Sequence, residues 1–277
     1  MPVRAPLPRD PTELPAITAE FREVVDQALV RLGLELTPGM REAIDAQARL
    51  LVAWGPIVNL SAIRDPEAIA LEHVADSLAA VPPLLDHLAG RRTRRRAIGL
   101  LDLGSGAGYP GLPVAVAVPV ATAALVESVS RKAAFLDVAA LAAERALAAH
   151  GEEPVRVRVV TARAEELARR PDHRGRWDVV TARAVAPLPA LLELALPLVR
   201  VGGLFVAWKR DAGDGAFDAE LAAALPLLAE LGADSRPEVR PVTLEGLRDH
   251  VLVFIIQRRA APQRRRRRVG RPPRLLP

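Results

Sequence analysis

The spacing of apolar residues predicts three helices in the first third of the chain. One covers residues 17–33, where Gly33 ends the pattern, and a second begins at Thr37 and Pro38. A third covers residues 66–78. The residues expected to face the core are Val24, Val25, Ala28, Leu29 and Leu32 in the first helix, Ile44, Ala48, Leu51 and Val52 in the second, and Ile69, Val74 and Leu78 in the third.

From residue 97 the pattern changes to short apolar runs that alternate with helical stretches. The runs cover residues 98–103, 121–126, 155–160, 177–182 and 203–208, and the clearest helix covers 131–150. This alternation predicts an α/β fold, with a parallel sheet covered by helices on both faces. A helix over 217–231 and two strands over 238–243 and 250–256 follow. Only turn residues separate these two strands, which predicts an antiparallel pair at the sheet edge.

Three segments differ in composition from the rest. Residues 1–16 are rich in proline and predict an irregular lead-in, and residues 90–96 contain five arginines. Residues 258–277 contain nine arginines and no acidic residue. We therefore expect a helical N-terminal domain with a basic connector at 17–96, an α/β domain at 97–258 and a disordered arginine-rich tail at 259–277.

The tail changes the interpretation of the net charge. The whole chain carries a net charge of +5. Without the nine arginines of residues 258–277, the remaining residues 1–257 carry −4. Such a tail attracts polyanions without reading their sequence, although a dispensable extension is the alternative. The chain has no cysteine, which excludes disulfides and thiolate chemistry. Its start lacks the apolar region of a signal peptide, so we expect a soluble, cytoplasmic monomer with no membrane partner.

A glycine-rich loop, residues 102–111, follows the first predicted strand and can be read in two frames. Gly106, Gly108 and Gly111 fit the dinucleotide pattern G-x-G-x-x-G. Gly104, Gly106 and Gly108 instead form G-x-G-x-G after an acidic residue, as in S-adenosylmethionine sites. We favour the second frame because its first glycine stands at the strand end, where such sheets bind ligands.

Acidic residues follow the next two strands. Glu127 ends the second strand, where a carboxylate can accept hydrogen bonds from both ribose hydroxyls of NAD or of S-adenosylmethionine. A solvated glutamate is the alternative. Ala164 and Glu165 follow the third strand, where an adenine would lie, although Glu165 also suits the first turn of a helix. His73 and Asp76 are three residues apart on one helix face, which favours a structural hydrogen-bonded pair over a metal site.

Several ordered segments together resemble one family. They are Trp54 with residues 59–66, residues 73–78, the loop 102–111 with Pro113, and residues 127–132, 181–184 and 207–209. Over about residues 20–257 the chain resembles the ribosomal small subunit methyltransferase G family, also called glucose-inhibited division protein B. The resemblance implies a Rossmann-like class I S-adenosylmethionine-dependent methyltransferase fold behind a small helical N-terminal domain. It also implies methylation of guanine N7 at position 527 of 16S ribosomal RNA.

The resemblance implies a set of site residues. The cofactor contacts are Gly104, Gly106, Tyr109, Glu127, Ala164, Glu165 and Arg183. Tyr109 stands where a smaller residue is frequent in the family, so its contact is through the ring or only through the backbone. Arg210 replaces a frequent glycine after Lys209, which leaves the path of that loop open.

The implied chemistry needs orientation and no general base, because guanine N7 carries an exposed lone pair. Arg183 and Lys209, at successive strand ends, are candidates for orienting the base. Lys132 and Lys209 are the only two lysines among 38 basic residues. Each lysine is expected to contact a phosphate or a carboxylate, with chance survival as the alternative, and together with Arg64 the lysines are candidates for binding RNA. We expect no metal.

Two other functions stay open at this point. An NAD-dependent oxidoreductase would use the dinucleotide frame of the glycine loop. A non-catalytic RNA-binding factor for ribosome assembly would use the arginine tail, although the intact loop and Glu127 argue against it. The expected partner is 16S ribosomal RNA or the small ribosomal subunit.

Overall fold

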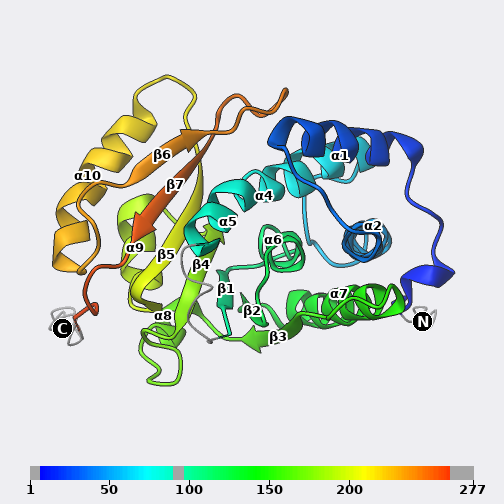
Figure 1. The fold of residues 1–277 in the computed structure, drawn as a ribbon, viewed down its shortest axis with the longest axis horizontal. Coiled ribbons are helices and arrows are strands. Elements are labelled where there is room, and N and C mark those ends of the chain that lie inside the picture. The colour runs from blue at the N-terminus through cyan, green and yellow to red at the C-terminus, as the bar shows by residue number, and fades with distance from the viewer. Residues whose placement is uncertain (1–6, 90–96, 263–277) are drawn as a thin grey trace, which may run out of the picture.

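The computed structural model describes residues 7–89 and 97–262, and these form a seven-stranded sheet in the order β3-β2-β1-β4-β5-β7-β6 (Figure 1). Strands β1 to β5 are parallel, β7 is antiparallel to β5, and β6 is antiparallel to β7. The strands are β1 (Gly99–Leu103), β2 (Thr122–Glu127), β3 (Arg156–Thr161), β4 (Trp177–Arg183), β5 (Val199–Arg210), β6 (Glu238–Pro241) and β7 (His250–Ile256). The predicted parallel sheet and its antiparallel edge pair are confirmed.

Helices cover both faces of the sheet (Figure 1). Side chains alternate along β1, so that Leu100 belongs to one hydrophobic cluster and Leu101 to the other. Helices α6 (Gly111–Ala117) and α7 (Ser130–Ala149) cover the Leu100 face. Helices α8 (Ala164–Leu167), α9 (Leu188–Ala195) and α10 (Ala216–Glu230) cover the Leu101 face. Both faces are therefore buried, as a parallel sheet requires.

The N-terminal helices extend the layer on the Leu100 face. They are α1 (Ala19–Leu32), α2 (Pro38–Trp54), α3 (Pro66–Ala68), the π-helical turn η2 (Ile69–Ala75), α4 (Asp76–Leu78) and α5 (Val81–Ala89). Helix α2 packs on α7, where the rings of Trp54 and Phe135 meet edge to face with centroids 5.6 Å apart. The helices thus share one hydrophobic cluster with the sheet. The division into an N-terminal domain over residues 17–96 and an α/β domain over residues 97–258 stays a prediction.

Local signals account for the helix ends. The Thr18 hydroxyl accepts a hydrogen bond from the Phe21 amide, 3.2 Å away, at the start of α1. Gly33 ends α1 in the left-handed conformation with φ of 61°. At the start of α2, the Thr37 hydroxyl accepts from the Met40 amide in the same way. The predicted limits of these helices are confirmed within a few residues.

One local expectation is wrong. Val52 is 41 % exposed, because it lies about 100° around α2 from the buried Leu51. The predicted helix over 66–78 is confirmed, and its centre is the π-helical turn η2. The lead-in contains a 3₁₀ helix, η1 (Pro11–Glu13), and the Trp54 indole donates to the Pro8 carbonyl at 2.7 Å. The basic connector at 90–96 and most of the arginine tail lie outside the described residues.

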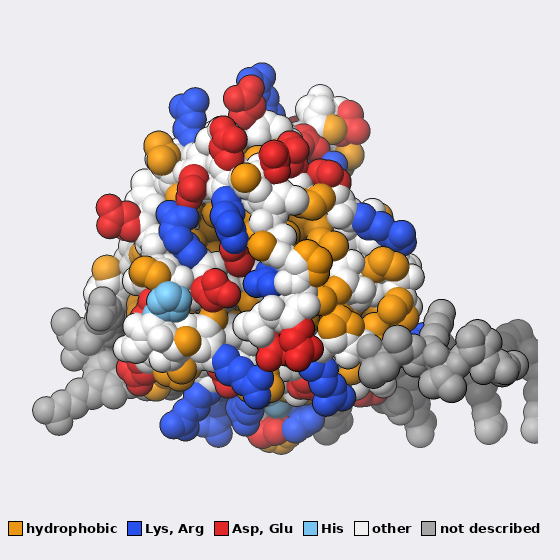
Figure 2. Space-filling view, turned by 90° about the vertical axis from the view of Figure 1, so that its right-hand side faces the viewer, with side chains coloured by type: hydrophobic (Ala, Val, Ile, Leu, Met, Phe, Trp, Pro, Cys, Tyr) orange, Lys and Arg blue, Asp and Glu red, His pale blue; other side chains and the backbone are white. Residues whose placement is uncertain are grey.

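The surface over the N-terminal helices mixes charges of both signs (Figure 2). Ion pairs connect α1 to α2 there, between Arg22 and Asp45 at 3.0 Å and between Arg41 and Asp26. One helical stretch, Pro66–Ala89, has the length and apolar composition to cross a membrane, but 61 % of its most apolar window is buried inside the molecule. It is therefore a core helix of this fold.

Candidate active site

The glycine loop follows β1 at the carboxyl edge of the sheet. Gly104, Gly106 and Gly108 have left-handed backbone angles, with φ of 68°, 55° and 88°, a conformation that glycine adopts at no steric cost. A Cβ on Gly104 would lie 2.7 Å from Cγ2 of Val185. The segment after β4 can therefore approach the loop only because residue 104 has no side chain.

Helix α2 holds the other side of this loop. The buried Gln47 donates from Nε2 to the carbonyl oxygen of Ala107, 2.9 Å away. A Cβ on Gly108 would lie 2.7 Å from the same nitrogen. The sequence reasoning missed Gln47, whose signal is a polar residue on the apolar face of a helix, a position that requires a hydrogen-bond partner. The N-terminal helices thus fix the shape of the glycine loop.

Glu127 ends β2 beside the loop and is 7 % exposed. One carboxylate oxygen accepts a hydrogen bond from the Gly106 amide at 3.1 Å, and the other accepts from the Val129 amide at 2.8 Å. These two bonds fix the orientation of the carboxylate. Each carboxylate oxygen can accept more than one hydrogen bond, so capacity remains for a ligand.

A cavity of about 520 Å³ lies against Glu127 and the loop, and we call it the glycine-loop cavity. Its volume is in the range of small-molecule sites. Four of the predicted cofactor residues line it, namely Gly104, Glu127, Ala164 and Glu165. The other lining residues are Val126, Ser128, Ala162, Arg163, Val185, Ala186, Ala190, Glu193 and Leu194.

A second cavity, of about 390 Å³, lies next to it, and we call it the arginine cavity. Its lining residues are Ile63, Glu72, His73, Asp76, Arg183, Ala184, Trp208, Lys209, Arg210 and His250. The segment 183–186 joins the two cavities, because Arg183 and Ala184 line this one whereas Val185 and Ala186 line the glycine-loop cavity. Ala184 has φ of 57°, a strained conformation for a residue other than glycine.

Arg183 is held by three groups from the N-terminal helices. Its Nη1 donates to the Glu72 carbonyl and to the Asp76 carboxylate, each at 2.7 Å, and its Nη2 lies 2.9 Å from Nδ1 of His73. Asp76 is fully buried and also bonds Nδ1 of His250 at 2.8 Å. His73 and Asp76 are therefore connected through Arg183, instead of forming the direct pair expected from the sequence.

The bonds of His73 define its tautomer. Arginine cannot accept a hydrogen bond, so Nδ1 of His73 is the acceptor and Nε2 carries the proton. Nε2 therefore donates to the Ser61 hydroxyl, 2.8 Å away. Burial, followed by the nearby charge of Arg183, lowers the pKa of His73 to about 4. His73 is thus neutral at physiological pH and can accept from Arg183.

Lys209, at the end of β5, is paired inside the structure. Its Nζ lies 2.5 Å from Oε1 of Glu220 on α10 and donates to the Ala186 carbonyl at 3.4 Å. Its side chain is only 14 % exposed. The sequence reasoning missed Glu220. It lies eleven residues after Lys209 and in a different element, so no local sequence pattern indicates the Lys209–Glu220 ion pair.

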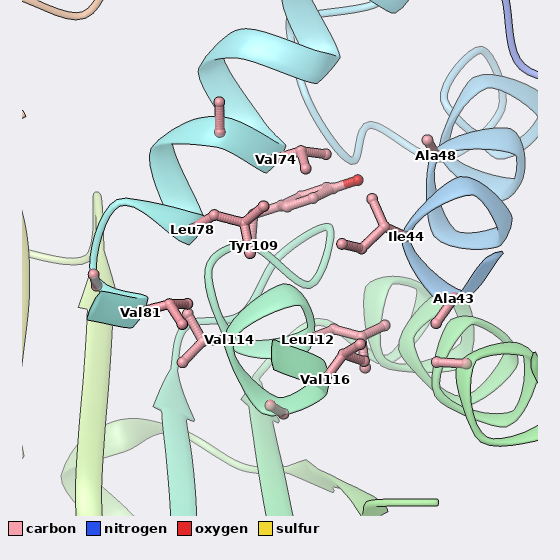
Figure 3. Packing of buried hydrophobic residues seen from close by; sticks show 14 of the residues in the cluster. Ala43, Ile44, Ala48, Val74, Leu78, Val81, Tyr109, Leu112, Val114 and Val116 are labelled. Atoms are coloured by element: carbon pink, nitrogen blue, oxygen red, sulfur yellow. The ribbon is translucent and has the colours of Figure 1, made fainter. Parts of the chain in front are cut away.

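Tyr109 is buried and lines neither cavity. Figure 3 shows its ring between Val74 of η2 and Ile44 of α2, within the shared hydrophobic cluster. The ring also stacks on His73, with centroids 4.8 Å apart and planes at 16°. Of the two contacts that the sequence left open for Tyr109, only the one through its backbone agrees with this position.

Asp102 lies below the loop and is completely buried. Its Oδ1 accepts a hydrogen bond from the Thr181 hydroxyl at 2.7 Å. Burial raises the pKa of Asp102 to about 6, and the bond from Thr181 opposes the rise. A Cβ on Gly111 would lie 2.5 Å from Cβ of Asp102. The last glycine of the dinucleotide frame therefore packs against Asp102 and does not line the cavity.

The remaining candidates lie apart from the two cavities. Lys132 is half-buried in the first turn of α7, and Arg64 is exposed before α3. Neither lines the glycine-loop cavity or the arginine cavity. Within residues 7–89 and 97–262, no group of three His, Cys, Asp or Glu side chains could hold a metal ion.

Comparison with known proteins identifies the family. Residues 40–219 match the family described as rRNA small subunit methyltransferase G. The ribosomal RNA small subunit methyltransferase G of Roseiflexus castenholzii is 40 % identical over 87 % of this chain and 93 % of that protein. The protein of the same name from Symbiobacterium thermophilum is 36 % identical over 91 % and 96 % of the two chains.

Solved structures agree on the fold. The O-methyltransferase TomG of Streptomyces achromogenes, solved with S-adenosylmethionine, gives a TM-score of 0.52 at 19 % identity and covers 87 % of this chain and 100 % of that chain. The O-methyltransferase of Bacillus cereus, solved with S-adenosylhomocysteine, gives 0.51 at 17 % identity and covers 84 % and 96 %. The class I methyltransferase fold is confirmed, and the oxidoreductase and assembly-factor alternatives find no support. The chain belongs to the rRNA small subunit methyltransferase G family.

Proposed function

We propose that this chain transfers a methyl group from S-adenosylmethionine to N7 of the guanine at position 527 of 16S ribosomal RNA, in the cytoplasm and as a monomer. The observation that carries the proposal is the pair of adjoining cavities joined by the segment 183–186. The glycine-loop cavity has Gly104 and the fixed carboxylate of Glu127 in its wall. The arginine cavity has the oriented cations Arg183 and Lys209 in its wall. A methyl donor and an RNA base need two such sites in contact.

S-adenosylmethionine is the cofactor of this methyltransferase, and the residues of the glycine-loop cavity fit it. The Glu127 carboxylate would accept from the ribose hydroxyls, while Ala164 and Glu165 would lie along the adenine. Gly104 lets Val185 close against the glycine loop, since a Cβ on Gly104 would lie 2.7 Å from Cγ2 of Val185. When bound, the cofactor supplies an electrophilic methyl group on a sulfonium.

The arginine cavity suits a guanine that needs to be held in position but does not need to lose a proton. The N7 lone pair is available without a general base, so the side chains only need to hold the base in line. Three of the five N–H donors of Arg183 bond described residues. The other two can donate to guanine O6, which arginine recognises in nucleic acids. Neutral His73 keeps the guanidinium in place.

We assign RNA contacts outside the cavity to phosphates. Arg64 is exposed and Lys132 is half-buried on the surface, so both can reach a backbone that approaches the cavities. Lys209 is paired with Glu220 and mostly covered, which suits a contact within the arginine cavity better than one to a distant phosphate. Phosphate contacts position the RNA, and the cavity selects the base.

The test is methyl transfer to small ribosomal subunits from S-adenosylmethionine with a labelled methyl group. Reduction of the RNA followed by aniline treatment cleaves the chain only at 7-methylguanosine, so primer extension maps the site. We expect one new cleavage at position 527, and weaker cleavage there with a Glu127→Ala variant at limiting cofactor. Label without cleavage, or cleavage at other guanines, would contradict the proposal.

A further inference from the structure

We propose that Glu220 is a positioning residue for methyl transfer, which neutralises Lys209 so that the arginine cavity can accept a new positive charge. This inference rests on the proposed function. Glu220 belongs to α10, outside every motif that carries the family resemblance, and its carboxylate acts through Lys209 rather than on the substrate.

The geometry ties Glu220 to the cavity wall. Its Oε1 lies 2.5 Å from Nζ of Lys209 and also accepts from the amide of Leu188, at the start of α9. The two paired side chains are 14 % and 22 % exposed, so solvent screens the pair only in part. Lys209 donates as well to the carbonyl of Ala186, on the segment that joins the two cavities.

Every cation that lines the arginine cavity faces a carboxylate. Arg183 bonds Asp76 at 2.7 Å, and Arg210 lies 3.3 Å from Asp249. Lys209 has Glu220 as its partner, and the carboxylate of Glu72 lies 4.0 Å from Arg210. The three cations therefore face four carboxylates, so the cavity wall presents oriented donors without a net positive charge.

The reaction explains why this matters. The N7 lone pair forms a bond to the methyl carbon while the carbon–sulfur bond breaks and its electron pair stays on sulfur as a neutral thioether. No proton moves, and the positive charge passes from the sulfonium to the purine ring. An unpaired ammonium beside the ring would oppose this charge in the transition state, where fixed charges have their largest effect.

The matched variants separate charge from structure. Glu220→Gln keeps an oxygen acceptor for the Leu188 amide and removes only the negative charge. Glu220→Asp keeps the charge. Asp218→Asn removes the same charge from an exposed position on the same helix. In the methylation of small subunits, we expect Glu220→Gln to lower kcat about tenfold without raising KM for RNA. Glu220→Asp should have a kcat close to that of the wild type, and Asp218→Asn should have the same kcat as the wild type.

The dependence on Lys209 completes the test. In a Lys209→Met background, Glu220→Gln should cause no further loss of kcat, because no ammonium remains to be neutralised. Unchanged kcat in Glu220→Gln, or an equal loss in both backgrounds, would overturn the inference. A wild-type enzyme that modifies no guanine N7 would instead overturn the proposed function, whatever the variants do.

Discussion

Asp102→Asn should change how the stability of the protein depends on pH. The Asp102 carboxyl has a pKa of about 6 in the folded chain because of burial, against 3.8 as its usual value. Between these values the folded state keeps a proton that the unfolded state has lost, so the contribution of Asp102 to the stability of the wild type falls as the pH rises from about 4 to about 6. An asparagine at this position does not titrate.

The magnitude follows from the shift. At about 1.36 kcal/mol per pKa unit, ionised Asp102 costs the folded state about 3 kcal/mol. The amide side chain of the variant keeps an oxygen that can accept from the Thr181 hydroxyl, as Oδ1 of Asp102 does. The unfolding free energy of Asp102→Asn, taken relative to the wild type, should therefore rise by about 3 kcal/mol between about pH 3.5 and about pH 7.

His73 titrates in the opposite sense within the same range. Its pKa is lowered from 6.5 to about 4, so the folded state lacks a proton that the unfolded state holds, and stability rises as the pH increases through this window. The two effects nearly cancel in the wild type between about pH 4 and about pH 6. His73→Asn should therefore show the reverse trend, losing about 3 kcal/mol relative to the wild type as the pH rises.

Urea denaturation of the cofactor-free protein, followed by tryptophan fluorescence at half-unit pH steps, measures both trends. The comparison with the wild type removes the contribution of all other titrating groups. A difference between Asp102→Asn and the wild type that stays constant from about pH 4 to about pH 7 would refute the reasoning. It would mean that Asp102 ionises with an ordinary pKa despite its burial.

Three further predictions concern function. Glu127→Ala should weaken S-adenosylhomocysteine binding by about 1 to 3 kcal/mol in calorimetry, and unchanged affinity would remove Glu127 from the site. Arg183→Lys should reduce the rate of methyl transfer about a hundredfold and leave cofactor affinity unchanged, because a single ammonium cannot donate to all the groups that the guanidinium contacts. Full activity of this variant would limit Arg183 to a structural role. Truncation after Pro262 removes seven arginines, so RNA binding should depend less steeply on salt concentration while cofactor affinity stays the same. Identical salt slopes for the full-length and truncated proteins would show that the tail does not contribute to RNA binding.

The interactions that sequence reasoning missed join residues far apart in the chain. Gln47 and Ala107 are 60 residues apart, Asp76 and Arg183 are 107 apart, and Asp76 and His250 are 174 apart. Periodicity and motif spacing describe neighbours along the chain, so they carry no information about such pairs. The direction of the Tyr109 ring was open for the same reason, because it depends on the helices that pack over the loop.

The sequence by itself determined the order of helices and strands, and it placed Gly104 and Glu127 at the carboxyl edge of the sheet. Caps, apolar periods and left-handed glycines act within a few residues, and the carboxyl ends of parallel strands always meet at one edge. Only the tertiary structure decided which groups hold Arg183, which carboxylate neutralises Lys209, and how the two cavities adjoin. Those features arise where the N-terminal helices, the strand ends and α10 pack together, and the positions of buried polar partners depend on that packing.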